Sequence, residues 1–178
     1  MSFIDGRFEV PNESGGYHGL LLKWMEQYGM GKICFLIGEG EEVKKRFITK
    51  FPDVEFYTVE ISDKLRPDFL WDVCTEISGS LKEFEGRVDL VVCQAVIEHI
   101  LDPITAMKNF TRLLKKDGYL IVETPFWSFM EHRFPIDCIR YLPDWFHHIP
   151  DIIPELKLIA YHSEKNVQLA LYRKPELI

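Results

Sequence analysis

The stretch VDLVVCQAVIEHILDPITAMKNFTRLLKKDGYLIVETP, residues 88–125, contains the pattern that decides the fold. It begins with a largely apolar run, 88–95, which is typical of a strand buried on both faces of a sheet. The Asp-Pro pair at 102–103 then marks the start of a helix, because aspartate is a favoured N-cap and proline fits the first helical position. A second apolar run, 119–123, follows Gly118. The stretch therefore predicts a strand, a helix and a second strand in succession.

The predicted helix has one apolar face, and its end is marked by charge and by glycine. Lys115 and Lys116 suit the negative end of the helix dipole. Gly118 is expected to take the left-handed conformation that ends the helix. The spacing of the apolar positions is that of a helix packed on a sheet, and these positions are Ile104, Met107, Phe110, Leu113 and Leu114.

The rest of the chain continues the alternation of strands and helices. Leu70 and Trp71 of the third strand are expected to face the core. Residues 1–16 are polar and rich in Gly, Pro and Asn, which predicts an irregular arm. The remaining strands are predicted at 32–37, 54–61, 67–73, 156–161 and 167–172, and the helices at 17–28, 41–50 and 143–148.

This alternation predicts an α/β fold in one domain over residues 1–178. The sheet is expected to be Rossmann-like, seven-stranded and mostly parallel, with an antiparallel strand from a C-terminal hairpin and helices on both faces. Ligands of such sheets bind at the carboxyl ends of the strands, near the point where the strand order reverses.

Composition narrows the function. The net charge is −7 and the positive residues are scattered, so we expect no nucleic-acid partner. No apolar run reaches the length of a membrane span, and the first residues lack the apolar core of a signal peptide. The four cysteines form no CxxC pair. These features favour a cytoplasmic protein with free thiols and no membrane contact.

Several polar residues are expected at the ligand-binding edge. Gly38-Glu39-Gly40 follows the first strand, where glycines allow a backbone to approach a ligand closely. Glu60 ends the second strand about 20 residues later, a position from which a carboxylate accepts hydrogen bonds from ribose hydroxyls. Asp72 follows the third strand and suits an adenine amine, although a helix cap or a surface acid is an equal alternative. Gln94 ends the fourth strand beside the same edge.

At these residues the sequence resembles the class I S-adenosylmethionine (SAM)-dependent methyltransferases, in particular the broad type 11 group. The resemblance rests on Asp89 and its strand, the Ile97-Glu98-His99 triplet, Asp102-Pro103, the segment 112–118 and Thr124-Pro125. It implies that Gly38, Glu39 and Gly40 border the methionine part of SAM and that Glu60 holds the ribose. It also implies that Asp72 and Val73 contact the adenine and that Gln94 lines the pocket.

The chain departs from the pattern of this family at three places. Leu36 stands where an acidic residue is usual, and Glu42 replaces the third glycine of the loop. The interval between Glu60 and Asp72 is short, so the helix usually found there is expected to be short or missing. These departures keep a second hypothesis open, a non-catalytic protein of the same fold that serves as a partner or regulatory subunit. A nicotinamide-dependent oxidoreductase is disfavoured, because the loop lacks the glycine that packs helix against strand.

Two histidines are candidates for a catalytic base, since histidine changes charge near neutral pH. They are His99, for which a structural role after the fourth strand is favoured, and His132, in the segment after the fifth strand. That segment resembles a loop of some type 11 relatives and is the expected acceptor site. An Asp137–Arg140 ion pair is at least as plausible as acceptor binding by Arg140. The expected acceptor-binding residues are Trp127, Phe129, Phe134, Asp137, Arg140 and Tyr141.

No metal is expected, because His132, Asp137, His147 and His148 show no spacing typical of metal ligands. The leading hypothesis is an enzyme that transfers a methyl group from SAM to an oxygen or nitrogen of a small molecule, such as a sugar or a natural-product intermediate. The oligomeric state is not determined by the sequence.

Overall fold

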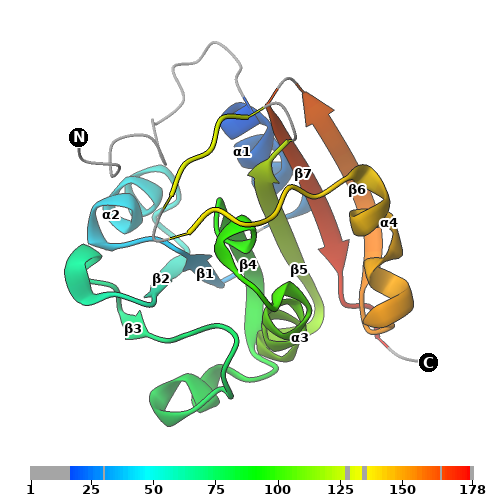
Figure 1. Ribbon diagram of the computed structural model, residues 1–178. Helices are drawn as coiled ribbons and strands as arrows, with labels where there is room; N and C mark the ends of the chain where they lie inside the picture. Colours follow the sequence, from blue (N-terminus) through cyan, green and yellow to red (C-terminus); the bar gives the residue numbers. More distant parts are fainter. Residues whose placement is uncertain (1–16, 30, 127–128, 134–135, 165, 177–178) are drawn as a thin grey trace.

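The computed structural model describes residues 17–29, 31–126, 129–133, 136–164 and 166–176, which form a seven-stranded sheet with helices packed on it (Figure 1). The predicted arm at 1–16 lies outside these residues. The strands are β1 (Ile33–Ile37), β2 (Glu55–Glu60), β3 (Phe69–Leu70), β4 (Val88–Gln94), β5 (Leu114–Pro125), β6 (Lys157–Glu164) and β7 (Val167–Arg173). The α-helices are α1 (Tyr17–Tyr28), α2 (Glu41–Lys50), α3 (Pro103–Leu113) and α4 (Pro143–Ile152), and the 3-10 helices are η2 (Asp63–Leu65), η3 (Gly79–Phe84) and η4 (Ile97–His99).

The strand order is β3-β2-β1-β4-β5-β7-β6. Strands β1 to β5 pair in parallel, and β7 runs antiparallel between β5 and β6. The order reverses between β1 and β4, so the ligand-binding edge predicted for such sheets lies at the carboxyl ends of these two strands. The predicted fold class, with its antiparallel C-terminal hairpin strand, is confirmed.

Helices cover both faces of the sheet because successive strand residues point to opposite sides. Phe35 and Val91 face the layer that contains α3 and α4, together with Met107 of α3. Leu36 and Val92 face the layer that contains α1 and α2. Every residue of β4 is buried, as expected for a central strand covered on both faces.

The central helix begins where the sequence indicates and ends earlier. The Asp102 side chain accepts a hydrogen bond from the Thr105 amide at 3.1 Å, which caps α3. The helix ends at Leu113, and the following lysines belong to the start of β5 rather than to the last helical turn. The left-handed residue is Asp117, with φ of 62°, and not Gly118 as predicted. Gly118 is instead needed for close packing, since a Cβ there would lie 3.0 Å from the Val88 carbonyl oxygen.

The third strand is much shorter than the predicted 67–73. Only Phe69 and Leu70 pair with β2, because the Asp68 side chain occupies the preceding amide of that strand, Thr58 N, at 2.7 Å. Leu70 is exposed, which corrects its predicted core position, whereas Trp71 is buried as expected. The helix between β2 and β3 is reduced to the single 3-10 turn η2, which agrees with the short interval in the sequence.

The amino end of β4 is held by Asp89. Its carboxylate accepts the amides of Lys32 at 3.0 Å and Ile33 at 2.9 Å, and it forms an ion pair with Lys115. Burial favours the neutral acid, but these contacts together keep the pKa of Asp89 below its usual range. A Cβ at Gly31, where φ is +63°, would lie 2.2 Å from the Asp89 carboxyl. Position 31, two residues before β1, therefore has room only for glycine.

Candidate functional site

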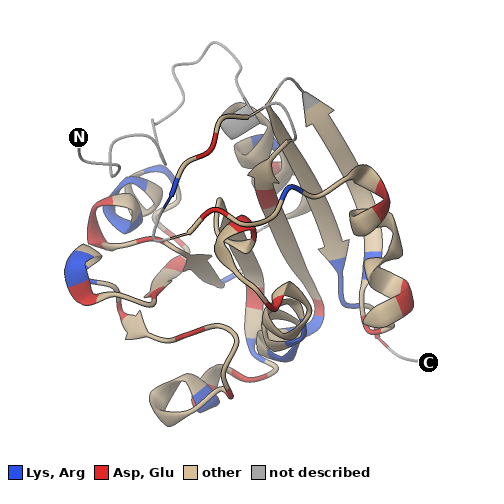
Figure 2. Cartoon of the chain, in the orientation of Figure 1, with Lys and Arg blue, Asp and Glu red and all other residues tan. Residues whose placement is uncertain are grey.

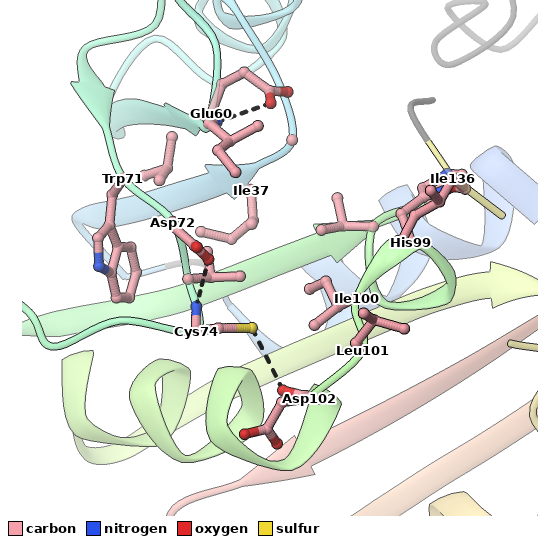
Figure 3. A pocket seen from close by; sticks show the side chains of 16 residues that line it. Ile37, Glu60, Trp71, Asp72, Cys74, His99, Ile100, Leu101, Asp102 and Ile136 are labelled. Atoms are coloured by element: carbon pink, nitrogen blue, oxygen red, sulfur yellow. Dashed lines mark hydrogen bonds between the residues drawn. The ribbon is translucent and has the colours of Figure 1, made fainter. Parts of the chain in front are cut away.

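A cavity of about 430 Å³ opens at the carboxyl ends of β1, β2 and β4, at the predicted edge (Figure 3). Glu60 and Asp72 lie on one side of it, and His99 and Ile136 lie on the opposite side. The volume falls within the range of small-molecule sites, roughly 300–1,000 Å³. The wall between the polar groups is largely apolar and includes Ile37, Val59, Ile61, Val73, Val96, Ile100 and Leu101.

Of the three residues of the glycine loop, only Gly38 lines the cavity. Its φ of 81° is favourable only for glycine, and its amide donates to the Val59 carbonyl at 2.8 Å. Gly40 serves packing, because a Cβ there would lie 2.1 Å from the Leu65 carbonyl oxygen. Glu39 is buried away from the cavity. The turn η2 therefore packs closely against the loop. This packing explains why residue 40 is glycine without any direct contact to a ligand.

Two predicted carboxylates do lie at the cavity, and backbone amides hold both. Glu60 is buried, and its Oε1 accepts the Ile61 amide at 2.8 Å. Asp72 Oδ1 accepts the Cys74 amide at 2.9 Å. Val73, between Asp72 and Cys74 in the chain, lines the same wall of the cavity. Each carboxylate is therefore fixed by its own strand end, with its charge at the edge of the cavity.

Gln94 does not line the cavity. It is buried at the end of β4, and its Nε2 donates to Glu123 Oε2 at 3.0 Å. Burial raises the pKa of Glu123 to about 7, with the Gln94 bond acting against the shift and the Glu98 charge adding to it. The two side chains form a polar pair beneath the site.

The two candidate histidines meet around a buried glutamate, Glu98. His99 lines the cavity, and its Nδ1 contacts the Ile136 carbonyl oxygen. His132 Nε2 lies 3.3 Å from Glu98 Oε1, and His99 Nε2 lies 3.5 Å from the same oxygen. The Glu98 carboxylate raises the pKa of His132, and partial burial opposes this shift. The rings of the two histidines pack edge to face with centroids 4.9 Å apart.

The segment that carries the expected acceptor-binding residues crosses the carboxyl ends of the central strands (Figure 1). Asp137 and Arg140 form the ion pair that the sequence left open, and this guanidinium lowers the pKa of Asp137 to about 2. Tyr141 is a core residue, because its ring is buried and its hydroxyl donates to the Ile97 carbonyl at 2.9 Å. Phe129 is partly exposed with its ring 5.2 Å from that of His132. Trp127 and Phe134 lie outside the described residues.

Some residues of the site carry little sequence signal. Glu98 belongs to the quoted triplet, and its complete burial between two histidines could have been suspected only by pairing the triplet with the later His132. Ala95 has φ of 49° at the end of β4 and lines the cavity, an unusual backbone for a residue with a Cβ. Ile136 joins the wall through a loop contact that no periodicity predicts.

Charged side chains of both signs lie close together on the surface beside the site. Figure 2 shows Lys and Arg interspersed with Asp and Glu along α2 and the turn η2, which follows β2. Lys45 and Arg66 both pair with Glu41 there, at 3.0 Å in each case. In the described part of the chain, no helix is both long and apolar enough to cross a membrane.

Comparison with known proteins identifies the family. A methyltransferase domain profile matches residues 13–173, so the chain belongs to this methyltransferase family. The family's cofactor is SAM. Comparison with curated protein sequences gives no significant match.

Many solved structures share the fold. A putative methyltransferase of Bacillus halodurans C-125 has a TM-score of 0.67 at 11% identity, covering 87% of this chain and 98% of that one. The 1,6-didemethyltoxoflavin-N1-methyltransferase of Burkholderia thailandensis, solved with bound 1,6-didemethyltoxoflavin and S-adenosylhomocysteine, has a TM-score of 0.65 at 12% identity, covering 87% of this chain and 76% of that one. The N-methyltransferase NodS of Bradyrhizobium japonicum WM9, in complex with S-adenosylhomocysteine, has a TM-score of 0.62 at 15% identity, covering 90% of this chain and 86% of that one.

The hydrogen-bond acceptors and apolar side chains that line the cavity fit the family's cofactor. The ribose of SAM offers hydroxyl donors and its adenine an amine donor, and both need acceptors such as the Glu60 and Asp72 carboxylates. The adenine ring also needs apolar surface, which Ile61, Val73 and Ile100 supply. The fit is to the nucleoside half of SAM, because Glu39 and Gly40 do not reach the cavity.

Proposed function

We propose that this protein is a SAM-dependent methyltransferase that acts on an oxygen or nitrogen of a small molecule. The observation that carries the proposal is the cavity at the reversal of strand order, with Glu60 and Asp72 on one wall and His99 on the other. The first wall has the acceptors that a nucleoside requires, and the second has a group able to accept a proton.

The proposed cofactor contacts divide between direct and supporting residues. Glu60 would accept the ribose hydroxyls, and Asp72 with Val73 would bind the adenine. Gly38 would pass beside the methionine part, where its left-handed backbone keeps the loop close. Glu39, Gly40 and Gln94 would act from behind, by holding the loop and the end of β4 in place. SAM supplies an activated methyl group, so the protein mainly has to align donor and acceptor.

The acceptor would enter from the side of His99 and the segment after β5. His99 and His132 are the candidate bases, and Phe129 offers apolar contact at the rim. The Asp137–Arg140 pair and the buried Tyr141 would shape this segment rather than touch the acceptor. A small acceptor is supported by the small cavity and by the names of similar structures, which include N-methyltransferases. The net charge of −7 disfavours nucleic acid.

The four cysteines are free thiols, which agrees with a reducing compartment such as the cytoplasm. The alternative, a non-catalytic partner protein of the same fold, is motivated by the altered glycine loop, of which only the first glycine reaches the cavity.

Calorimetry with S-adenosylhomocysteine tests the proposal directly. Binding with one molecule per chain is expected, and heat that vanishes in an excess of SAM would show a shared site. Absence of binding at millimolar ligand would exclude the enzyme and favour the partner protein. Where binding is found, incubation with methyl-labelled SAM and a panel of hydroxyl and amine acceptors identifies the methylated atom.

A further inference from the structure

Glu98, His99 and His132 bring three potential ligand atoms within 4.8 Å of one another. They come from distant parts of the chain, since η4 carries the first two and the segment after β5 carries the third. Two imidazoles and one carboxylate are a ligand set used for divalent transition metals. We propose that these residues form a binding site for one divalent transition-metal ion at the wall of the cofactor cavity.

The distances match those of ligands around one ion. Glu98 Oε1 lies 3.3 Å from His132 Nε2 and 3.5 Å from His99 Nε2. Ligand atoms at about 2.1 Å from a metal are separated by about 3.4 Å in a tetrahedral site and about 3.0 Å between octahedral neighbours. Both histidines therefore lie at ligand-to-ligand distance from Glu98 Oε1, and because all three atoms lie within 4.8 Å of one another, a modest approach of the two histidines would let them share one ion.

The protonation pattern leaves lone pairs directed at the same point. His99 Nδ1 contacts the Ile136 carbonyl, which can only accept, so the proton of the neutral ring lies on Nδ1. Its Nε2 then presents a lone pair toward the Glu98 carboxylate, and neither Nε2 nor Oε1 has a hydrogen bond of acceptable geometry among the described residues. Two buried acceptors that face each other repel unless a cation or a proton lies between them.

Each ligand has a polar group on its other side, as metal ligands in proteins usually do. His132 Nδ1 lies 3.2 Å from Asp137 Oδ2, an ion-pair distance without hydrogen-bond geometry among the described residues, so the Asp137 carboxylate faces the side of the ring away from the cluster. Glu98 Oε2 accepts the Thr124 hydroxyl at 3.1 Å. Asp137 is in turn fixed by Arg140 and by the backbone amide of His132 at 2.7 Å.

The site is open on one side. Glu98 is fully buried, but His99 lines the cavity and the side chain of His132 is 23% exposed. Three protein ligands with remaining open positions are typical of catalytic rather than structural metal sites. An oxygen of the acceptor could complete the coordination, and this link to catalysis rests on the proposed function. The metal-binding proposal itself does not depend on the proposed function. With the ion bound, the histidine lone pairs are used as ligands, so His99 and His132 can serve as the proposed bases only in the metal-free protein.

The test is metal binding to the full chain, prepared without a histidine tag and treated with a chelator. Titration with Zn²⁺ in the calorimeter should show one ion per chain, and Co²⁺ should give the visible absorption of a site with nitrogen ligands. The variants His132→Ala and Glu98→Gln should each weaken Zn²⁺ binding more than 100-fold. Asp137→Asn should weaken it about 10- to 100-fold, since it removes only the support of His132.

The matched controls are His148→Ala and Glu83→Gln, exposed residues outside the cluster, which should leave the affinity unchanged. Circular dichroism and S-adenosylhomocysteine binding verify that each variant is folded. If the wild-type chain takes up neither Zn²⁺ nor Co²⁺, the proposal is overturned whatever the variants do. Binding lost in His148→Ala but kept in His132→Ala overturns it as well. Binding of S-adenosylhomocysteine without metal binding leaves the proposed function standing. Metal binding without S-adenosylhomocysteine binding removes the proposed function and keeps the metal site.

Discussion

The two ends of the central strands β4 and β5 both hold buried carboxylates in opposite electrostatic settings. At the amino end, Asp89 has two backbone amides and Lys115 as partners, and its pKa is lowered. At the carboxyl end, burial raises the pKa of Glu123 to about 7, against the effect of the Gln94 amide and with a smaller contribution from the Glu98 charge. At the amino end the Asp89 carboxylate has hydrogen-bond and ion-pair partners and stabilises the fold. At the carboxyl end the acidic side chains of Glu123 and Glu98 lie close enough to interact. Stability and function are therefore separated along the same strands.

Removing Asp89 tests the stabilising end and should have the largest effect. Asp89→Ala leaves two amides without their charged acceptor, and each such bond contributes about 1.5–3 kcal/mol. We expect the free energy of unfolding to fall by about 3–6 kcal/mol in urea titrations. The control Asp151→Ala, an exposed residue of α4, should change it by less than about 0.5 kcal/mol. A loss as small as the control's would contradict the role assigned to Asp89.

Replacing Glu123 tests the opposite end through pH. Because the folded-state pKa is raised, the native state holds the extra proton between the usual carboxyl range and about pH 7. The stability of the wild type should therefore fall as pH rises through this window, by roughly 2–3 kcal/mol, and Glu123→Gln should lack this component. Urea unfolding of both proteins from pH 5 to 8.5, with chelator present, measures the difference. A gap between them that stays constant with pH would refute the raised pKa.

Glu60 tests whether the carboxyl edge binds the nucleoside. Glu60→Ala removes charge-assisted hydrogen bonds to the ribose, so S-adenosylhomocysteine binding should weaken by about 1.5–3 kcal/mol, or about 10- to 100-fold. Glu55→Ala, at the exposed amino end of the same strand, is the matched control and should bind as the wild type does. Equal affinities of the two variants in calorimetry would exclude the ribose contact.

Asp72 should show the smallest effect. Asp72→Asn keeps an acceptor for the adenine amine and loses only its charge, so a weakening of about 5-fold is expected, close to 1 kcal/mol. Calorimetry with S-adenosylhomocysteine measures the difference between the wild type and this variant. An affinity of Asp72→Asn equal to that of the wild type would place the adenine elsewhere.

The sequence predicted the elements whose signals are local. The buried strand β4, the capped helix α3 and the C-terminal hairpin appear where their patterns indicated, because strand and helix periodicity and capping depend on neighbours in the chain. Local reasoning was wrong where a distant contact decided. Asp68 occupies an amide of β2 next to the short strand β3, and Leu70 is exposed on this edge strand. The left-handed backbone before Tyr119 falls on Asp117, and Gly118 instead lies close to the Val88 carbonyl oxygen.

The site divides in the same way. Gly38, Glu60, Asp72 and Val73 reach the cavity because parallel strands bring their carboxyl ends to one edge, and that rule follows from the fold class. Gln94 and Tyr141 are turned into the interior instead, where their hydrogen bonds with Glu123 and the Ile97 carbonyl are made. A residue type and its position along a strand do not specify which way its side chain turns.

The sequence by itself thus determined the order of the elements, the family resemblance and the edge at which ligands would bind. Only the tertiary structure decided that His132 reaches Glu98 and His99 across more than thirty residues of chain. The physical reason is that periodicity reports which face of an element is apolar, whereas the convergence of polar side chains from loops depends on packing and backbone contacts that no local pattern encodes.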